Sequence, residues 1–538
     1  MITDITNNTI TPHRPQFTGA VDGLATQVLR TLDTNPMANA VGIDLFAMVG
    51  PRTYIDTKER NVNAGFETFF REFTGTLIVC LSASYLAKGI SKLANKIINP
   101  ETPINTNSWF SNESIAILQA AHKNTTKSSN YVLNILNNIS GRDGKTIKNY
   151  KDIDWTNTEW VNDSKWKNYK WDNPKCNNIA DKLKSGKEIN SLISELIENK
   201  NISEKDSKQL QNILEFRITN ALKSDKVNVK IGEKTLSSSL HNILRDTIDL
   251  GKNVFYNSKI DSKKAISKIF KINKIKGLGA LAIASTLGLT NQYINRKLTE
   301  KRTGKSGFPG DSNYKGVEPS NKKDTSKLFL AEKILASIGM AAMALGVMKI
   351  KSPADFIKKL EFTGPVTSGN AIKTVYASTL IGRFLASDNK RELKETVTRD
   401  YFGFLNWLVL GGFAAKGVAN ILDPKQENLF NISKSGKGIR HWLNNISLKS
   451  HNEILAQGSK FAKKNMWKMN LAHVGGLAYS TLALGVLLPK LNIYLANHSH
   501  NEKVKNKIKE MKTQNISMTG FMNKRNQQFD CIKNTFSL

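Results

Sequence analysis

The sequence predicts a mainly α-helical protein, in which two related membrane-type helical hairpins carry a polar helical domain inserted into the first hairpin. Two observations predict this fold class. Long uncharged runs alternate with hydrophilic segments, and one stretch of sequence occurs twice. Mean hydropathy over the 538 residues is −0.36, so any membrane portion is a minority of the chain.

The repeated stretch comprises residues 67–93 and 395–421, which align without a gap at a constant offset of 328 positions (395 − 67). Eight aligned positions are identical, and the charged ones are Glu67/Glu395, Arg71/Arg399 and Lys88/Lys416. Unrelated segments of this length share about two identities at ordinary residue usage. We interpret the match as an internal duplication.

The charges of the repeat have a predictable geometry. Glu and Arg four positions apart face each other on a helix, so Glu67 is expected to pair with Arg71, and Glu395 with Arg399, on a surface turn before each apolar run. Lys88 and Lys416 are expected to reach toward lipid headgroups. Small residues are expected to let helices approach closely, namely Gly75, Ser82, Gly89, Gly403, Gly411 and Gly412.

A second apolar segment follows each repeated segment, at residues 277–295 and 469–489, with 19 and 21 uncharged residues. The shorter one would be about 28 Å long as a helix, close to a hydrocarbon core of about 30 Å. Basic residues after both repeated segments predict that both hairpin inserts lie on the cytoplasmic side. The number of spans between the repeats decides whether they are parallel or inverted, and the sequence leaves this open.

Composition divides the chain into eight segments. They are a helical lead-in (1–66), the first repeat helix (67–99), a basic soluble helical insert (100–270), an apolar helix (271–300), a linker (301–330), apolar and amphipathic helices (331–394), the second repeat hairpin (395–495) and a basic tail (496–538). In the lead-in, an amphipathic stretch at 24–48 is expected to break at Pro36 and to end at Gly50-Pro51. A weaker apolar segment at 374–386 is interrupted by Arg383.

The insert at 100–270 has the patterns of a soluble domain. Apolar residues recur at helical spacing in 183–197 and 210–222, and Ser203 with Asp206 resembles a capping box for the second helix. Alternating Val227, Val229 and Ile231 before a glycine predict a short strand pair.

The net charge of +33, from 78 basic and 45 acidic residues, would ordinarily suggest nucleic acid or an anionic surface as partner. Lysine accompanies asparagine and isoleucine throughout, however, which is typical of an AT-rich coding sequence, so nucleic-acid binding is not expected. The expected partner is the lipid bilayer, and the sequence leaves a protein partner or self-association open. The first thirty residues show no cleavable signal peptide.

No residue pattern predicts catalysis, a cofactor or a metal. The Gly-Lys-Thr/Ser triplets at 144–146 and 304–306 lack the first glycine of a phosphate loop. His498-Ser499-His500 with Glu502 is interpreted as solvated surface, and His473 as an interfacial residue of the last apolar segment. The three cysteines, Cys80, Cys176 and Cys531, have no regular spacing. The tryptophans Trp155, Trp160, Trp166 and Trp171 also have irregular spacing and are predicted to form a loop-rich subdomain core.

Three functions are compatible with these patterns. The first hypothesis is a non-enzymatic, membrane-associated structural or interaction protein. One alternative is a small-solute transporter or pore built from the two repeats, with the Glu-x-x-x-Arg motifs near a pseudo-twofold axis. The other is a soluble helical assembly protein whose apolar runs are buried core helices.

Overall fold

The computed structural model describes residues 23–98, 111–141, 169–173, 189–198, 202–303, 324–359, 369–432 and 438–495, and also residues 144, 146, 176 and 436. The protein is mainly helical, as the sequence predicts, with 79% of the part that the structure describes in helices. The tail 496–538 lies outside the described residues, as do most of the predicted linker, Leu183, Cys531, Trp155, Trp160, Trp166, His498 and His500.

The helical lead-in consists of consecutive short helices. α2 (Leu24–Thr34) ends at Asn35, whose side chain caps α3 (Pro36–Gly42), so the predicted break at Pro36 is confirmed. The predicted end at Gly50-Pro51 is wrong, because the helix continues through the π-helical η1 (Ile43–Val49) into α4 (Gly50–Glu59). The wide turn bonds Gly50 N–H to Leu45 O, five residues back, and such turns accommodate a proline without an N–H.

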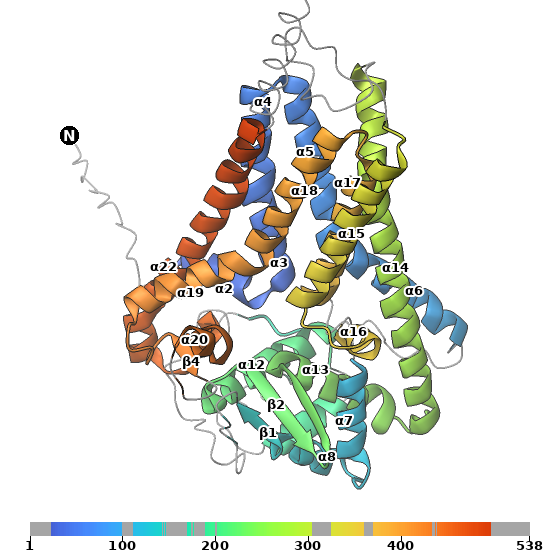
Figure 1. Ribbon diagram of the computed structural model, residues 1–538. Helices are drawn as coiled ribbons and strands as arrows, with labels where there is room; N and C mark the ends of the chain where they lie inside the picture. Colours follow the sequence, from blue (N-terminus) through green and yellow to red (C-terminus); the bar gives the residue numbers. More distant parts are fainter. Residues whose placement is uncertain are drawn as a thin grey trace, which may run out of the picture.

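The two repeated segments each form a long helix with a π-helical turn inside it. The first consists of α5 (Val62–Thr76), η2 (Leu77–Ser82) and α6 (Ala83–Ile98), and the second of α18 (Lys390–Leu405), η7 (Asn406–Leu410) and α19 (Gly411–Leu422). The other helices of the bundle are α14 (Ser262–Thr303), α15 (Lys327–Val347), α16 (Pro353–Lys359), α17 (Gly369–Ala386), α22 (Ser459–Ser480) and η8 (Thr481–Leu487). α14 packs along α6 and α17, and α22 packs along α19 (Figure 1).

Among the described residues, four helices are long and apolar enough to cross a membrane: Val62–Ile98, Lys327–Val347, Lys390–Leu422 and Ser459–Leu495. The predicted apolar segment at 277–295 is not one of the four. Its threonine, asparagine and glutamine residues lower its hydropathy, although α14 lies in the same bundle.

Both repeated segments start at the same end of the bundle. Arg60, just after α4, pairs with Glu395 near the start of α18 at 2.6 Å, and Arg296 of α14 pairs with Asp388, just before α18, at 2.6 Å. Arg302, in the last turn of α14, stacks on the Phe66 ring of α5. Along the chain, three long helices, α14, α15 and α17, separate the two segments. Because each of the three crosses the bundle once, α5–α6 and α18–α19 run in the same direction (Figure 1).

The insert between α6 and α14 has a hydrophobic core of its own. Its described elements are α7 (Asn112–His122), α8 (Ser128–Leu136), β1 (Ile139–Gly141), α11 (Ile189–Glu198), α12 (Glu204–Leu222), β2 (Lys226–Ile231), β3 (Lys234–Ser239), α13 (Leu240–Leu250) and η5 (Gly251–Phe255). The predicted strand pair is confirmed, because β2 and β3 form an antiparallel hairpin turning at Gly232 with φ +60°. Ser203 caps α12 by accepting a hydrogen bond from Asp206 N–H.

A smaller insert lies between α19 and α22. It contains β4 (Phe430–Ile432), α20 (Ile439–Asn445), β5 (Ile446–Leu448) and α21 (His451–Ala456). The two inserts contact each other: Ser450 Oγ donates to Asp225 Oδ2 at 2.9 Å, and Lys223 Nζ donates to Ala456 O at 2.6 Å. Both inserts therefore lie at one end of the bundle, opposite the end where α5 and α18 begin (Figure 1).

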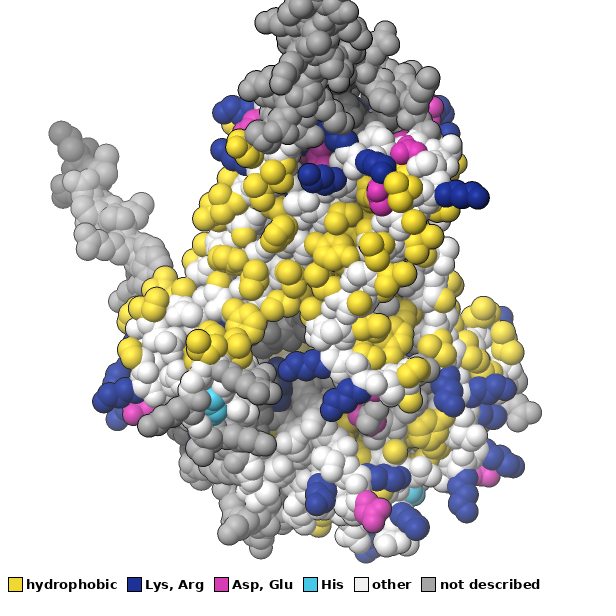
Figure 2. All heavy atoms as spheres, viewed as in Figure 1, with side chains coloured by type: hydrophobic (Ala, Val, Ile, Leu, Met, Phe, Trp, Pro, Cys, Tyr) yellow, Lys and Arg dark blue, Asp and Glu magenta, His cyan; other side chains and the backbone are white. Residues whose placement is uncertain are grey.

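The outer surface of the bundle is apolar at mid-height. Figure 2 shows hydrophobic side chains in a broad band across the face of the bundle in view, with Lys and Arg gathered above the band and over the domain below. On α15, Leu328, Leu335 and Ile338 are 64%, 72% and 61% exposed. The described surface therefore has an apolar band between two polar ends.

Candidate functional site

The repeat charges Glu67, Arg71 and Arg399 lie inside the bundle, and Glu395 lies at the edge of its interior. Glu67 and Arg71 are each 3% exposed and Arg399 is 8% exposed. The predicted location of these charges on a surface turn is wrong for Glu67, Arg71 and Arg399, which are buried. The charged side of each repeated segment faces neighbouring helices that carry carboxylates and arginines. These supply the partners that buried charges need.

Glu72 of α5 is shared by three arginines. Its Oε1 lies 3.2 Å from Arg71 Nη2 and 3.3 Å from Arg52 Nη1 of α4. Its Oε2 lies 3.3 Å from Arg383 Nη2 of α17. One carboxylate therefore joins three helices of the bundle.

Asp400 of α18 has the corresponding position in the second repeated segment. Arg399 Nε bonds Asp400 Oδ1 at 2.8 Å, and Arg383 Nη1 lies 3.3 Å from the same oxygen. Arg383 thus bridges Glu72 and Asp400, the acids of the two segments. The arginine that interrupts an apolar run in the sequence is 4% exposed and lies at the centre of this ionic layer, here defined as Arg52, Arg71, Glu72, Arg383, Arg399 and Asp400.

The two repeated segments share local structure beyond the aligned charges. Asn61 caps α5 by accepting from Ala64 N–H, and Asn389 caps α18 by accepting from Glu392 N–H. Both caps and both accepted N–H groups are 328 residues apart (389 − 61 and 392 − 64). The π-helical turns coincide at the same offset, because η2 ends at Ser82 and η7 at Leu410.

A glycine beside an arginine recurs in both segments. A Cβ on Gly75 would lie 3.6 Å from Arg383 Nη2, and a Cβ on Gly403 would lie 3.8 Å from Arg52 Nη2. Gly75 and Gly403 are aligned in the repeat. Each glycine therefore lies beside a guanidinium group from the helix that precedes the other repeated segment.

The expectations for the lysines and small residues hold in part. Lys88 is exposed, but Lys416 is only 6% exposed and its ammonium group donates to Trp442 O. The predicted extension of Lys416 toward lipid headgroups is wrong, because α20 covers it and the Trp442 ring lies 4.0 Å away. Gly411 approaches α22 closely, whereas a Cβ on Gly89 or Gly412 would meet nothing within 4 Å.

A small pocket opens beside the ionic layer toward the end of the bundle where α5 and α18 begin. It is lined by Arg71, Gln292, Arg383, Glu392, Glu395, Thr396 and Arg399. Its volume of about 10 Å³ corresponds to roughly one water molecule.

Several polar atoms near this pocket are buried without a hydrogen-bond partner among the described residues. They include Glu67 Oε2, Arg52 Nη2, Arg383 Nε and Gln292 Oε1. Such atoms are costly in a protein interior unless water or an ion satisfies them. The arrangement can therefore hold a water molecule or a small anion against guanidinium groups, but it contains no nucleophile paired with a base.

The sequence signals for this site are incomplete. Glu72 and Asp400 differ between the repeats, so a search for identical charges passes over them. Arg52 has no motif around it, and Arg383 reads only as an interruption of an apolar run. Their role depends on the packing of α4 and α17 against α5 and α18.

Two other features named from the sequence are described only in part. Gly144 has a φ of +78°, and Thr146 forms a single bridge to Ser140, while Lys145 and residues 304–306 lie outside the described residues. Trp171 packs at the edge of the core of the first insert. Cys80 and Cys176 are free and buried.

Fold and site together define a class: a helical bundle with long apolar helices, a buried arginine–carboxylate layer and a polar domain at one end. The chain matches no family model, no curated protein and no solved structure.

Proposed function

We propose that this chain is an integral membrane protein of structural or interaction type, without enzymatic activity. The observation that carries the proposal is the exposure of α15. The Lys327–Val347 helix has a mean hydropathy of 1.7 over its most apolar window, yet only 22% of that window is buried. A soluble protein buries such a helix, whereas lipid stabilises it on the surface.

The second part of the proposal is that α5–α6 with α14, and α18–α19 with α22, are two copies of one hairpin. The shared asparagine caps, the matching π-helical turns and the paired glycines support a duplication. The copies are parallel, and the ionic layer joins them. Buried ion pairs cost desolvation energy but fix the relative position of helices, and we assign that positioning role to Arg383.

In this proposal the bundle anchors the two inserts at one membrane face, which the positive-inside tendency makes the cytoplasmic face. Contacts between Asp225 and Ser450 and between Ser224 and Glu453 hold the inserts together. The insert surface is then available to a protein partner or to a second copy of the chain. Nucleic acid is not part of the proposal.

Alkaline extraction of membranes from cells that express the full chain tests this function. Integral insertion predicts that the protein stays in the pellet after an alkaline wash and is released by detergent. Recovery in the wash would instead support the soluble helical assembly protein.

One observation favours a second candidate, a transporter or pore for small anions. Three arginines, Arg71, Arg383 and Arg399, line the pocket beside the ionic layer. Vesicles containing the purified protein should then conduct chloride, and Arg399→Ala should reduce that flux at least tenfold while insertion persists. Equal chloride flux in empty vesicles and in vesicles with the protein would exclude transport and leave anchoring as the remaining function.

A further inference from the structure

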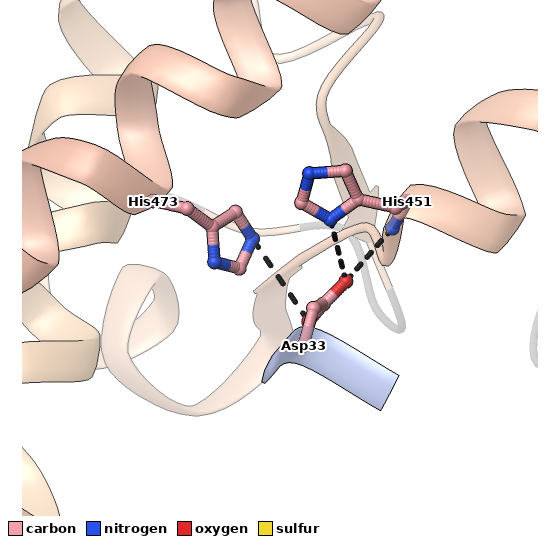
Figure 3. A group of neighbouring side chains, drawn as sticks. All are labelled: Asp33, His451 and His473. Carbon is pink, nitrogen blue, oxygen red and sulfur yellow. Dashed lines mark hydrogen bonds and ion pairs between the residues drawn. The ribbon is translucent and has the colours of Figure 1, made fainter. Parts of the chain in front are cut away.

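Asp33, His451 and His473 come together from three distant segments of the chain. Asp33 lies near the end of α2, His451 begins α21, and His473 lies within α22 (Figure 3). The oxygen or ring nitrogen that each can offer to a cation lies within 4.8 Å of the other two. The His451 side chain is fully buried, and the side chains of Asp33 and His473 are 17% and 21% exposed.

Hydrogen bonds determine which nitrogen of His451 faces the cluster. His451 Nε2 lies 3.1 Å from Asn470 Oδ1, and the amide nitrogen of Asn470 donates to Thr26 Oγ1 at 2.8 Å. With Asn470 in this orientation, Nε2 carries the proton and donates it. Histidines that bind metals characteristically donate from the second ring nitrogen to a fixed acceptor in this way.

The other nitrogen, His451 Nδ1, then presents a lone pair to an oxygen of Asp33. Nδ1 and Asp33 Oδ2 are 3.0 Å apart. A neutral nitrogen and a carboxylate oxygen repel each other at this distance, so a positive charge belongs between them. It is either a second proton on the ring or a metal ion.

His473 brings a second ring nitrogen to the same carboxylate, as a metal ion requires. Its Nε2 is directed toward Asp33 Oδ1 at 3.9 Å, which is too long for a hydrogen bond, and it has no hydrogen-bond partner among the described residues. Ligands of a tetrahedral zinc ion with bonds of about 2.0–2.1 Å are roughly 3.3 Å apart. The separations from Asp33 are 3.0 Å between Oδ2 and His451 Nδ1 and 3.9 Å between Oδ1 and His473 Nε2, and the three candidate ligand atoms all lie within 4.8 Å of one another.

We propose that Asp33, His451 and His473 bind one divalent transition-metal ion of the Zn²⁺ class, with water completing the coordination. Two imidazole nitrogens and one carboxylate oxygen suit Zn²⁺ and its neighbours, whereas Mg²⁺ and Ca²⁺ prefer oxygen ligands alone. The ion fastens α2 to α21 and α22, whose ligands lie 418 and 440 residues further along the chain (451 − 33 and 473 − 33). The sequence gives no sign of it, because no two of the three ligands are close in sequence.

The test uses the untagged, full-length protein in detergent, stripped with a chelator and titrated with Zn²⁺ alone. We expect one equivalent of bound zinc by elemental analysis, and competition with a zinc indicator should give at least tenfold weaker binding in His473→Gln and in Asp33→Asn. Co²⁺ in place of Zn²⁺ should give the visible absorption of a tetrahedral site, which both variants lose. Circular dichroism establishes that the variants are folded.

Two control variants should keep the wild-type affinity. His241→Gln removes a histidine that lies 2.7 Å from Glu215 Oε2 without belonging to a three-ligand group among the described residues. The double variant His498→Gln/His500→Gln removes the His-x-His of the tail. The proposal is overturned if no stoichiometric zinc binds, if His473→Gln binds zinc as tightly as wild type, or if the tail variant abolishes binding.

Discussion

Glu72→Gln is the most informative perturbation of the ionic layer, because it removes one charge and keeps the shape of the side chain. Arg52, Arg71 and Arg383 all lie 3.2–3.3 Å from the Glu72 carboxylate. Arg383 also pairs with Asp400, and Arg71 also contacts Thr68, whereas Arg52 donates from Nε to Leu484 O and forms its ion pair with Glu72. The variant therefore leaves buried guanidinium groups with less compensation.

The expected loss is about 3–5 kcal/mol in the free energy of unfolding, the usual result of removing one partner from a buried ion pair. Replacing Arg52 as well should restore part of it. The double variant Glu72→Gln/Arg52→Met is expected to be more stable than Glu72→Gln by at least about 1 kcal/mol, because it removes a buried charge that has lost its ion-pair partner.

Reversible unfolding by SDS in mixed micelles, followed by circular dichroism, measures these differences. Asp172→Asn is the matched control, because its carboxylate also contacts a basic group, Lys205 Nζ at 2.9 Å, but on the surface. It should change stability by less than about 0.5 kcal/mol. If Glu72→Gln costs no more than this control, the ionic layer does not hold the bundle together.

Three further predictions follow from the packing, the apolar surface and the insert. Gly382→Ala would place a Cβ 2.3 Å from Leu289 O of α14, so it should cost about 1–3 kcal/mol in the same unfolding assay. Gly412→Ala, with open space around it, should be neutral or stabilising by up to about 1 kcal/mol. Leu335→Asp should cost about 3 kcal/mol of insertion and lower the fraction that resists alkaline extraction, although a 72% exposed site in a soluble protein would tolerate it. Burial lowers the pKa of His122, so the unfolded chain binds the proton more tightly, and stability should fall as pH drops below about 6.5. Hydrogen exchange of α7 in the full-length protein should show this loss of stability at low pH in wild type and a smaller loss in His122→Gln. Equal acid sensitivity in the two proteins would refute the prediction.

The helical class and the main apolar helices could be predicted because each depends on a local pattern. Uncharged runs lie in long helices, Asn35 and Pro36 divide α2 from α3, and alternating valines mark β2. These signals involve residues a few positions apart, and tertiary packing does not reverse them.

The sites could not be predicted, because they depend on which helix faces cover one another. Nothing near Arg52 or Arg383 in the sequence indicates that both reach Glu72. A surface location for Glu67 and Arg71 is the natural expectation for an isolated helix, whereas packing in the bundle buries both residues. Only the approach of α2 to α21 brings Asp33 beside His451.

The central claim is that the bundle crosses a membrane with both inserts on one side, and single-cysteine labelling tests it most directly. In a background with Cys80, Cys176 and Cys531 replaced by serine, Glu233→Cys and Lys425→Cys place exposed thiols on the two inserts. Lys301→Cys places an exposed thiol at the opposite end of α14. Solubilised protein should react at all three positions.

A membrane-impermeant maleimide should label Glu233→Cys and Lys425→Cys from the same side of sealed vesicles, and Lys301→Cys only from the other side. Labelling of all three positions from one side would mean that the bundle does not cross the membrane. Labelling of the two inserts from opposite sides would contradict the parallel arrangement of the repeats.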